Sequence, residues 1–256
     1  MFIVLLFVSM RKSEKSETTK EQMRLLPVVR YQLLQRACHT SRSITDLIPS
    51  HTELSRDHLT PEIALHLITP RCKLWNSKGD DVPFPDPYWA FYWPGGQALT
   101  RFILDNPYIF ANKNIVDIGS GCGASAIACK MIGASSVVAN DIDKVAIGAI
   151  NLNATANQTE VSVSSENLIG SIDLNWNIVL LGDMFYDRHF VDIVSNWIPK
   201  LSNNNISVYV GDPGRLPLIN HPLSSKLEMV FKCELPEECL KGNNGMTSGY
   251  VWKYKP

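Results

Sequence analysis

The chain has 256 residues, of which 45% are hydrophobic and 19% are charged, and its formal net charge is −1. These values are typical of one globular α/β domain with a terminal extension. No apolar run reaches the roughly 18 residues of a membrane-spanning helix, so we expect no membrane partner. The six cysteines form no CxxC pair and stand at no zinc-finger spacing. A structural zinc site is therefore excluded, and free thiols in a reducing compartment are favoured.

The first 58 residues are expected to form an extension, followed by one domain over residues 59–256. Residues 11–43 carry eight Lys or Arg against three Glu, and residues 23–43 contain four arginines and no acidic residue. A basic, acid-poor, potentially amphipathic segment is typical of a mitochondrial presequence, possibly beginning at Met23, and favours targeting over nucleic-acid binding. The expected location is the mitochondrial matrix, with a cytoplasmic pool left open. A disordered basic tail is the alternative interpretation.

The domain is expected to begin with a short helix, because Thr60, Pro61 and Glu62 are typical of a helix start and Pro70 would end it. A proline-rich loop over residues 79–87 then leads to a strand-like aromatic run at Tyr88–Trp93. A helix is expected to follow Gly95-Gly96 and to end near Asp105.

Short apolar strands and helices alternate in the rest of the chain. Strands are expected at 115–118, 137–139, 161–163, 178–181 and 206–210, helices near 123–132, 144–157 and 188–198, and two final strands near 227–233 and 249–254. This alternation favours a mostly parallel sheet with helices on both faces.

A glycine-rich loop follows the strand at 115–118, and its residues indicate a nucleotide-like cofactor. Gly119 and Gly121 would let the backbone turn tightly beside a ligand. Asp117 precedes this GxGxG loop and would hold an ammonium group, while Asp141 ends the next strand and would accept ribose hydroxyls. This arrangement favours S-adenosylmethionine over the dinucleotide of a GxGxxG dehydrogenase. Mere turn glycines remain the structural alternative.

The reaction site is expected where the strands at 178–181 and 206–210 end. Asp183 would orient a lysine nitrogen and Tyr186 would line its channel, although a loop-capping carboxylate and simple packing are the alternatives. Asp212 and Arg215 would either pair with each other or meet the substrate. An Asn-Pro-Pro-aromatic motif is absent, and no carboxylate cluster suggests a metal. Trp93 would form an aromatic wall at the cofactor, or a packing contact at a helix start.

Several runs resemble the seven-stranded protein-lysine methyltransferases that carry an Asp-x-x-aromatic motif after a strand. The runs are LTPEI (59–63), TPRCK (69–73), DPYWAFYWPGGQAL (86–99), LDNP (104–107), DIGSGCGASAIA (117–128), ANDID (139–143), LGDMFYD (181–187) and GDPGR (211–215).

The resemblance implies a Rossmann-like fold whose sheet ends in an antiparallel carboxyl-terminal strand. It implies S-adenosylmethionine as cofactor, with Asn167 in the loop on the adenine side, and Asp183 and Tyr186 in the Asp-x-x-aromatic motif. The implied protein substrate is the β-subunit of the electron transfer flavoprotein, and we expect the enzyme to be a monomer. Two alternatives are methylation of a ribosomal protein and a non-catalytic chaperone of the flavoprotein.

Overall fold

The computed structural model describes residues 44–77, 83–240 and 245–256. The expected presequence at 23–43 and the alternative start at Met23 lie outside these ranges. No helix in the described ranges is both long and apolar enough to cross a membrane.

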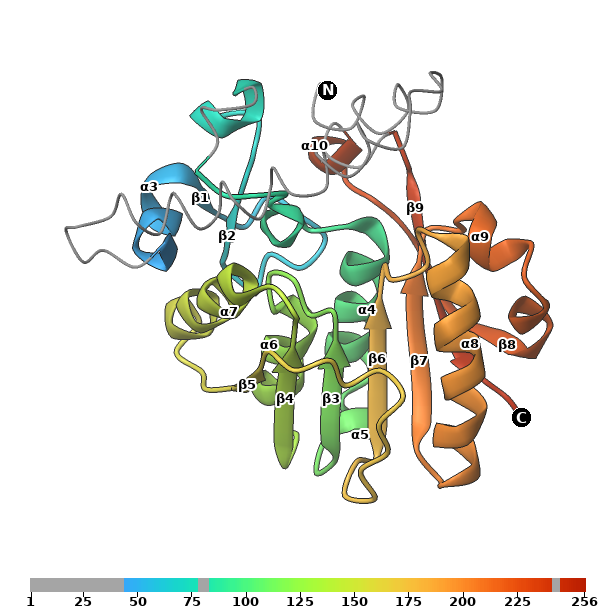
Figure 1. Cartoon of the computed structure of the whole chain (residues 1–256). Coiled ribbons are helices and arrows are strands. Elements are labelled where there is room, and N and C mark those ends of the chain that lie inside the picture. The colour runs from blue at the N-terminus through green and yellow to red at the C-terminus, as the bar shows by residue number, and fades with distance from the viewer. Residues whose placement is uncertain (1–43, 78–82, 241–244) are drawn as a thin grey trace, which may run out of the picture.

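A seven-stranded sheet forms the centre of the molecule, with the strand order β5-β4-β3-β6-β7-β9-β8 (Figure 1). The strands are β3 (Asn114–Ile118), β4 (Ser136–Asn140), β5 (Ser162–Ser164), β6 (Ile178–Gly182), β7 (Ser207–Asp212), β8 (Leu227–Glu234) and β9 (Ser248–Tyr254). The first five pair in parallel, whereas β9 runs antiparallel to both β7 and β8. This topology confirms the predicted fold class, including the antiparallel carboxyl-terminal strand.

Helices cover both faces of this sheet. They are α4 (Pro94–Asp105), α5 (Pro107–Phe110), α6 (Ala124–Met131), α7 (Lys144–Ala156), α8 (Arg188–Asn203), α9 (Leu216–Ile219) and α10 (Glu237–Leu240), with 3₁₀ turns η1 (Ile44–Leu47), η2 (Lys73–Asn76), η4 (Tyr88–Ala90) and η5 (Pro222–Lys226). Because neighbouring strand residues point to opposite faces, Ile115 packs with α4 and α6, and Val116 packs with α8. Full burial of each such side chain stabilises the fold by about 1.5–3 kcal/mol.

A two-stranded hairpin precedes the sheet and replaces the expected helix between Thr60 and Pro70, which is wrong. Strand β1 (Glu53–Ser55) pairs antiparallel with β2 (Leu65–Leu67), and residues 60–63 form a turn in which the Ile63 N–H donates to the Thr60 carbonyl. The reason is tertiary: Asn153 and Asn157 of α7 accept hydrogen bonds of 2.7 and 2.8 Å from the N–H groups of His66 and Ala64. An isolated helix-start signal cannot anticipate such distant partners.

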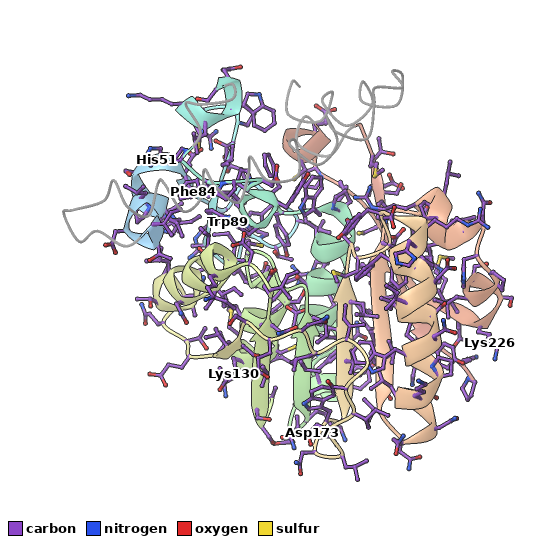
Figure 2. The ribbon with its side chains drawn as sticks, in the orientation of Figure 1. His51, Phe84, Trp89, Lys130, Asp173 and Lys226 are labelled. Atoms are coloured by element: carbon purple, nitrogen blue, oxygen red, sulfur yellow. The ribbon has the colours of Figure 1, made fainter. Side chains whose placement is uncertain are left out.

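The folded part of the chain begins before the expected boundary at residue 59. Helix α3 (Ile48–His51) buries Ile48 completely against the first half of α7. Figure 2 shows Phe84 between His51 and Trp89, and both contacts are edge-on, with ring centroids 5.8 and 5.4 Å apart. Residues 44–58 are therefore part of the domain.

The aromatic run at Tyr88–Trp93 is not a strand either. Its first part is the 3₁₀ turn η4, in which Trp89 is buried. The Ala90 carbonyl accepts a hydrogen bond of 2.8 Å from the Ile68 N–H, so the run is fixed against the end of the hairpin.

Candidate active site

Four carboxylates lie at the carboxyl ends of neighbouring parallel strands. Asp117 belongs to β3, Asp141 follows β4, Asp183 follows β6 and Asp212 ends β7. The arrowheads of β3, β4, β6 and β7 point to the same edge of the sheet (Figure 1). This edge is where ligands bind in open α/β sheets.

The glycine loop after β3 turns through three left-handed residues. Gly119, Gly121 and Gly123 have φ values of +64°, +55° and +81°, and α6 begins at the next residue. A Cβ atom at Gly119 would lie 2.1 Å from the sulfur of Met184. Glycine is therefore required at position 119 both by backbone conformation and by the close approach of the loop after β6.

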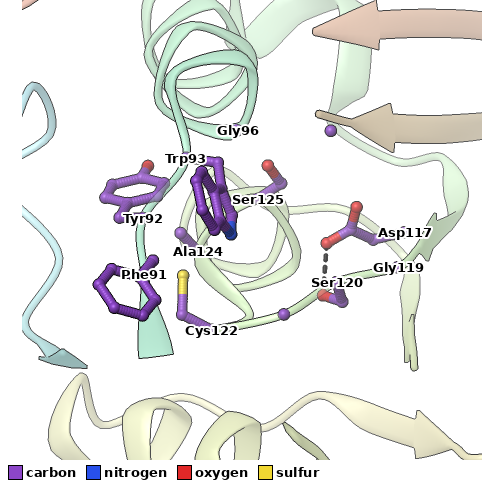
Figure 3. A pocket seen from close by; sticks show the side chains of 12 residues that line it. Phe91, Tyr92, Trp93, Gly96, Asp117, Gly119, Ser120, Cys122, Ala124 and Ser125 are labelled. Atoms are coloured by element: carbon purple, nitrogen blue, oxygen red, sulfur yellow. Dashed lines mark hydrogen bonds between the residues drawn. The ribbon is translucent and has the colours of Figure 1, made fainter. Parts of the chain in front are cut away.

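Asp117 forms the floor of the pocket beside this loop. Its side chain is almost fully buried, and its Oδ2 accepts a hydrogen bond of 2.5 Å from the Ser120 hydroxyl (Figure 3). Burial raises the pKa of Asp117 to about 7, although the Ser120 hydrogen bond opposes this shift. A cation bound next to Asp117 would favour the ionised carboxylate.

An aromatic wall closes the opposite side of the same pocket. Phe91, Tyr92 and Trp93 line the pocket together with the glycine loop, Cys122 and Gly182 (Figure 3). The indole N–H of Trp93 donates a hydrogen bond of 3.0 Å to the Tyr88 carbonyl, which orients the ring. Trp93 also caps α4, whose first residue is Pro94. Both interpretations of Trp93 are therefore compatible with its position.

Asp141 fastens the end of β4 to the glycine loop. Its Oδ2 accepts a hydrogen bond of 2.9 Å from the Gly121 N–H, and its Oδ1 accepts one of 3.0 Å from the Asp143 N–H. Burial is the main cause that raises the pKa of Asp141. Each carboxylate oxygen can accept a second hydrogen bond, so Asp141 can still receive ligand hydroxyl groups.

Asn167 lies apart from these residues. It is exposed, and its Oδ1 accepts a hydrogen bond of 3.1 Å from the Ile169 N–H within its own turn. It is not among the described residues that line the pocket. The buried Asn140 holds this loop instead, because its amide donates to the carbonyls of Ser164 and Glu166. The adenine-side role of Asn167 stays a prediction.

Asp183 joins three segments and is nearly buried, with 7% of its surface exposed. Its Oδ2 accepts a hydrogen bond of 2.6 Å from the Gly95 N–H at the start of α4, and its Oδ1 accepts one of 2.6 Å from Nε of Arg215. Burial raises the pKa of the Asp183 carboxyl, and the Arg215 charge counteracts that rise. Contact with an incoming amine stays a prediction, because both oxygens are engaged within the chain.

Two tyrosines flank the mouth of the pocket. Tyr186 is 63% exposed and stacks on Phe190, with ring centroids 5.8 Å apart. Tyr88 of η4 is 49% exposed, and the Tyr186 phenolate is near enough to contribute to its raised pKa, after burial and Asp86. Sequence reasoning missed Tyr88 because nothing in the motif around it marks an exposed ring. The lysine-channel role of Tyr186 stays a prediction.

Asp212 and Arg215 do not pair through their side chains. Asp212 is fully buried, and its Oδ1 accepts from the backbone N–H groups of Gly214 (2.8 Å) and Arg215 (2.7 Å). Its Oδ2 has no hydrogen-bond partner among the described residues. Burial first, and then the Asp183 charge, raise the pKa of Asp212 to about 7. The guanidinium of Arg215 instead pairs with Asp183, so direct substrate contact by Asp212 stays a prediction.

The sheet order and the glycine loop between β3 and α6 define a Rossmann-like fold with a ligand pocket at its strand ends. A family model described as "Ribosomal protein L11 methyltransferase (PrmA)" matches residues 99–196. The class of the protein is therefore that of the methyltransferases.

Two relatives with closely related names narrow this class. The electron transfer flavoprotein beta subunit lysine methyltransferase of Xenopus laevis is 45% identical over 211 residues, which cover 82% of this chain and 86% of the relative. The Homo sapiens protein of the same name is 44% identical over 216 residues, which cover 83% and 82%. The chain belongs to this family of lysine methyltransferases.

Among solved structures, the ribosomal protein L11 methylase of Lactobacillus delbrueckii subsp. bulgaricus is similar with a TM-score of 0.43 and 21% identity, covering 62% of this chain and 78% of that one. The L11 family model covers only residues 99–196, whereas the flavoprotein methyltransferases align with most of the chain. Neither methylation of a ribosomal protein nor a non-catalytic chaperone role is favoured.

Proposed function

We propose that this protein transfers methyl groups from S-adenosylmethionine to lysine side chains of the electron transfer flavoprotein β-subunit. The observation that carries the choice of cofactor is the pocket in which Asp117, the glycine loop and Asp141 converge. The choice of substrate is supported by the names of relatives that are 43–45% identical to the chain over 82–83% of its length.

The residues of the pocket fit this cofactor. The buried carboxyl of Asp117 suits the ammonium of a methionyl group, and the N–H groups at the start of α6 suit its carboxylate. Asp141 has accepting capacity left for ribose hydroxyls. Gly119 and Gly121 leave room for backbone approach, because no Cβ atom occupies the pocket side of the loop. When bound, S-adenosylmethionine supplies an electrophilic methyl group on a sulfonium.

The chain's own residues would prepare the lysine nitrogen. A lysine has a reference pKa of about 10.4 and must become neutral before it can act as a nucleophile. The apolar wall of Phe91 and Trp93 excludes water from the pocket, and desolvation lowers the pKa of an amine. Asp183 would keep this wall in place through the Gly95 N–H, two residues beyond Trp93. Positioning and electrostatics are then the expected sources of rate enhancement.

The proposed location is the mitochondrial matrix, where the basic segment at 23–43 would direct the chain. Fusion of residues 23–60 to a fluorescent reporter tests this location. A diffuse cytosolic signal would contradict it.

The activity is tested with recombinant protein from about residue 43, methyl-labelled S-adenosylmethionine and purified electron transfer flavoprotein. Label on a lysine of the β-subunit supports the proposal, and mass spectrometry identifies the modified residue. Calorimetric titration with the cofactor runs beside it. Absence of cofactor binding by folded protein would remove the basis of the proposal, whereas binding without labelling would leave the cofactor and reject the substrate.

A further inference from the structure

A second hollow, which we name the hairpin groove, lies between the β1–β2 hairpin and α10. Its volume is about 450 Å³, and Asp57, Arg71, Trp75, Phe91, Tyr92 and Glu237 are among the residues that line it. Figure 1 shows β1, β2 and α10 at the edge of the molecule to which the parallel strands point. The groove therefore opens on the same edge as the cofactor pocket.

The two hollows share a wall. Phe91 and Tyr92 line both the hairpin groove and the cofactor pocket. Three rings form a row across this boundary: the centroids of Trp75 and Phe91 are 6.3 Å apart, and those of Phe91 and Trp93 are 5.6 Å apart. Trp75 lines only the groove and Trp93 lines only the pocket. The row thus leads from one hollow to the other.

The groove carries a negative charge. The Arg71 guanidinium pairs with both Glu53 and Asp57, at 2.7 Å in each case, so this cluster of three groups has a net charge of −1. The exposed carboxylate of Glu237 adds a second negative charge. Burial lowers the pKa of His58, which also lines the groove, to about 4, and this side chain is therefore neutral near pH 7.

We propose that the hairpin groove binds a cationic, lysine-bearing segment of the protein substrate, and that the row of Trp75, Phe91 and Trp93 guides the target side chain to the cofactor pocket. This inference rests on the proposed function and names the surface that recognises the substrate. The apolar stem of a lysine packs on aromatic rings, and its ammonium is attracted by their faces. Carboxylates at the rim favour a basic segment over an acidic one and accelerate its association.

The test compares two groove variants with two matched controls in the full domain. Trp75→Ala removes the first ring, and Glu237→Lys reverses an exposed charge. Tyr108→Ala removes an exposed ring of α5, at the opposite end of the sheet, and Glu160→Lys makes the same charge reversal ahead of β5. Each protein is assayed for kcat and KM on intact electron transfer flavoprotein, for cofactor affinity by calorimetry, and for folding by thermal denaturation.

We expect Trp75→Ala and Glu237→Lys each to raise KM about fivefold or more, with kcat changed less than about twofold, because substrate binding is lost and the chemical step is retained. Cofactor affinity and both controls should be unchanged. A KM within about twofold of the parent in Glu237→Lys, whose exposed position makes misfolding improbable as a cause, would overturn the assignment. Failure of the parent protein to methylate the flavoprotein would instead reject the proposed function and the groove assignment together.

A photo-reactive residue at position 237 identifies the occupant. A cross-link to a lysine-containing peptide of the flavoprotein β-subunit is the expected product. A cross-link confined to this chain's own residues, or no cross-link at all, would overturn the proposed occupant.

Discussion

Arg215 and Asp183 form an ion pair that joins the ends of two neighbouring strands, with 2.6 Å between Nε of Arg215 and Oδ1 of Asp183. The side chains are only 16% and 3% exposed. The buried Asp212 stands beside them, and its pKa is raised partly by the charge of Asp183. One guanidinium therefore compensates a site that holds two carboxyl groups.

Removal of this guanidinium is expected to destabilise the protein. In Arg215→Ala the buried Asp183 carboxylate loses its counter-charge, and breaking a pair of this kind costs about 3–5 kcal/mol. Urea denaturation measures the change. The double variant Asp183→Asn/Arg215→Met should regain part of the loss, because no unpaired charge remains. Equal stabilities for the single and double variants would show that the pair carries little coupling energy.

Loss of the Asp183 carboxylate is expected to act on turnover. In Asp183→Ala the Gly95 N–H loses its acceptor and Arg215 is released, so we expect kcat to fall by a factor of about 10² or more. Cofactor affinity should change less than about threefold, because Asp183 does not line the pocket. Calorimetry with the cofactor and single-turnover kinetics separate these quantities. A parallel loss of affinity would instead show that Asp183 acts by holding Trp93 in the pocket wall.

The strand-end rule predicted much of the site from sequence. Asp117, Asp141 and Asp183 each follow or end an apolar run, and parallel strands bring such positions to one edge. The glycine loop was recognisable because the left-handed φ values of Gly119 and Gly121 are a local requirement that the sequence records directly.

Contacts between distant segments could not be predicted in this way. The bond from Gly95 to Asp183 joins residues 88 positions apart, and the pair of Asp183 with Arg215 spans 32 positions. The hairpin that replaced the expected helix is held by side chains of α7, more than 80 positions further along the chain. Local propensity is a weak prior, and these tertiary bonds override it.

Substitution of Gly119 is expected to weaken cofactor binding. In Gly119→Ala the new Cβ would meet the Met184 sulfur at 2.1 Å, and the residue would have to hold a φ of +64°. We expect cofactor affinity to fall about tenfold or more as the loop shifts, together with a backbone strain of about 1–3 kcal/mol. Calorimetric titration with S-adenosylmethionine measures the affinity.

Gly133→Ala is the matched control for this substitution. Gly133 also has a left-handed φ, of +88°, but nothing lies within 4 Å of its added Cβ. This variant should lose stability by a similar strain and keep its cofactor affinity. Equal affinity in both variants would contradict a ligand-binding role for the loop.

The pH dependence of cofactor binding should report on Asp117. Burial raises its pKa from 3.8 to about 7, so the folded apo protein holds a proton that the unfolded chain releases at lower pH. Its contribution to stability therefore falls as the pH rises from about 4 to about 7. A bound ammonium favours the ionised form, and we expect affinity to rise with pH over the upper part of this range and binding to release a proton.

Calorimetry at pH 5.5–7.5 in two buffers of different ionisation enthalpy measures this proton release, at values where the reference pKa of an α-amino group, about 7.7–8.0, keeps the ligand largely cationic. Asp117→Asn should abolish the pH dependence along with much of the affinity. Asp212→Asn is the control, because Asp212 also has a pKa of about 7 but does not line the pocket. A pH-independent affinity in the parent protein would contradict the assignment of Asp117 to the ammonium.

Two asparagines of α7 separate the stability of the hairpin from the function of the glycine loop. Asn153 is fully buried; its amide donates a hydrogen bond of 2.8 Å to the Cys122 carbonyl in the loop, and its Oδ1 accepts one of 2.7 Å from the His66 N–H in β2. Asn157 exchanges hydrogen bonds of 2.8 and 2.7 Å with the N–H and carbonyl of Ala64 and makes no printed bond to the loop.

Asn153→Ala should therefore lower both the free energy of unfolding, by about 2–3 kcal/mol, and the cofactor affinity, since it leaves buried backbone groups unpaired on the hairpin and on the loop. Asn157→Ala should cost about 1–2 kcal/mol and leave cofactor affinity unchanged, because only the hairpin loses its partner. Urea denaturation and calorimetric titration of the two variants give the comparison. If both variants bound the cofactor as tightly as the parent, the Asn153 amide would fasten the hairpin without shaping the glycine loop.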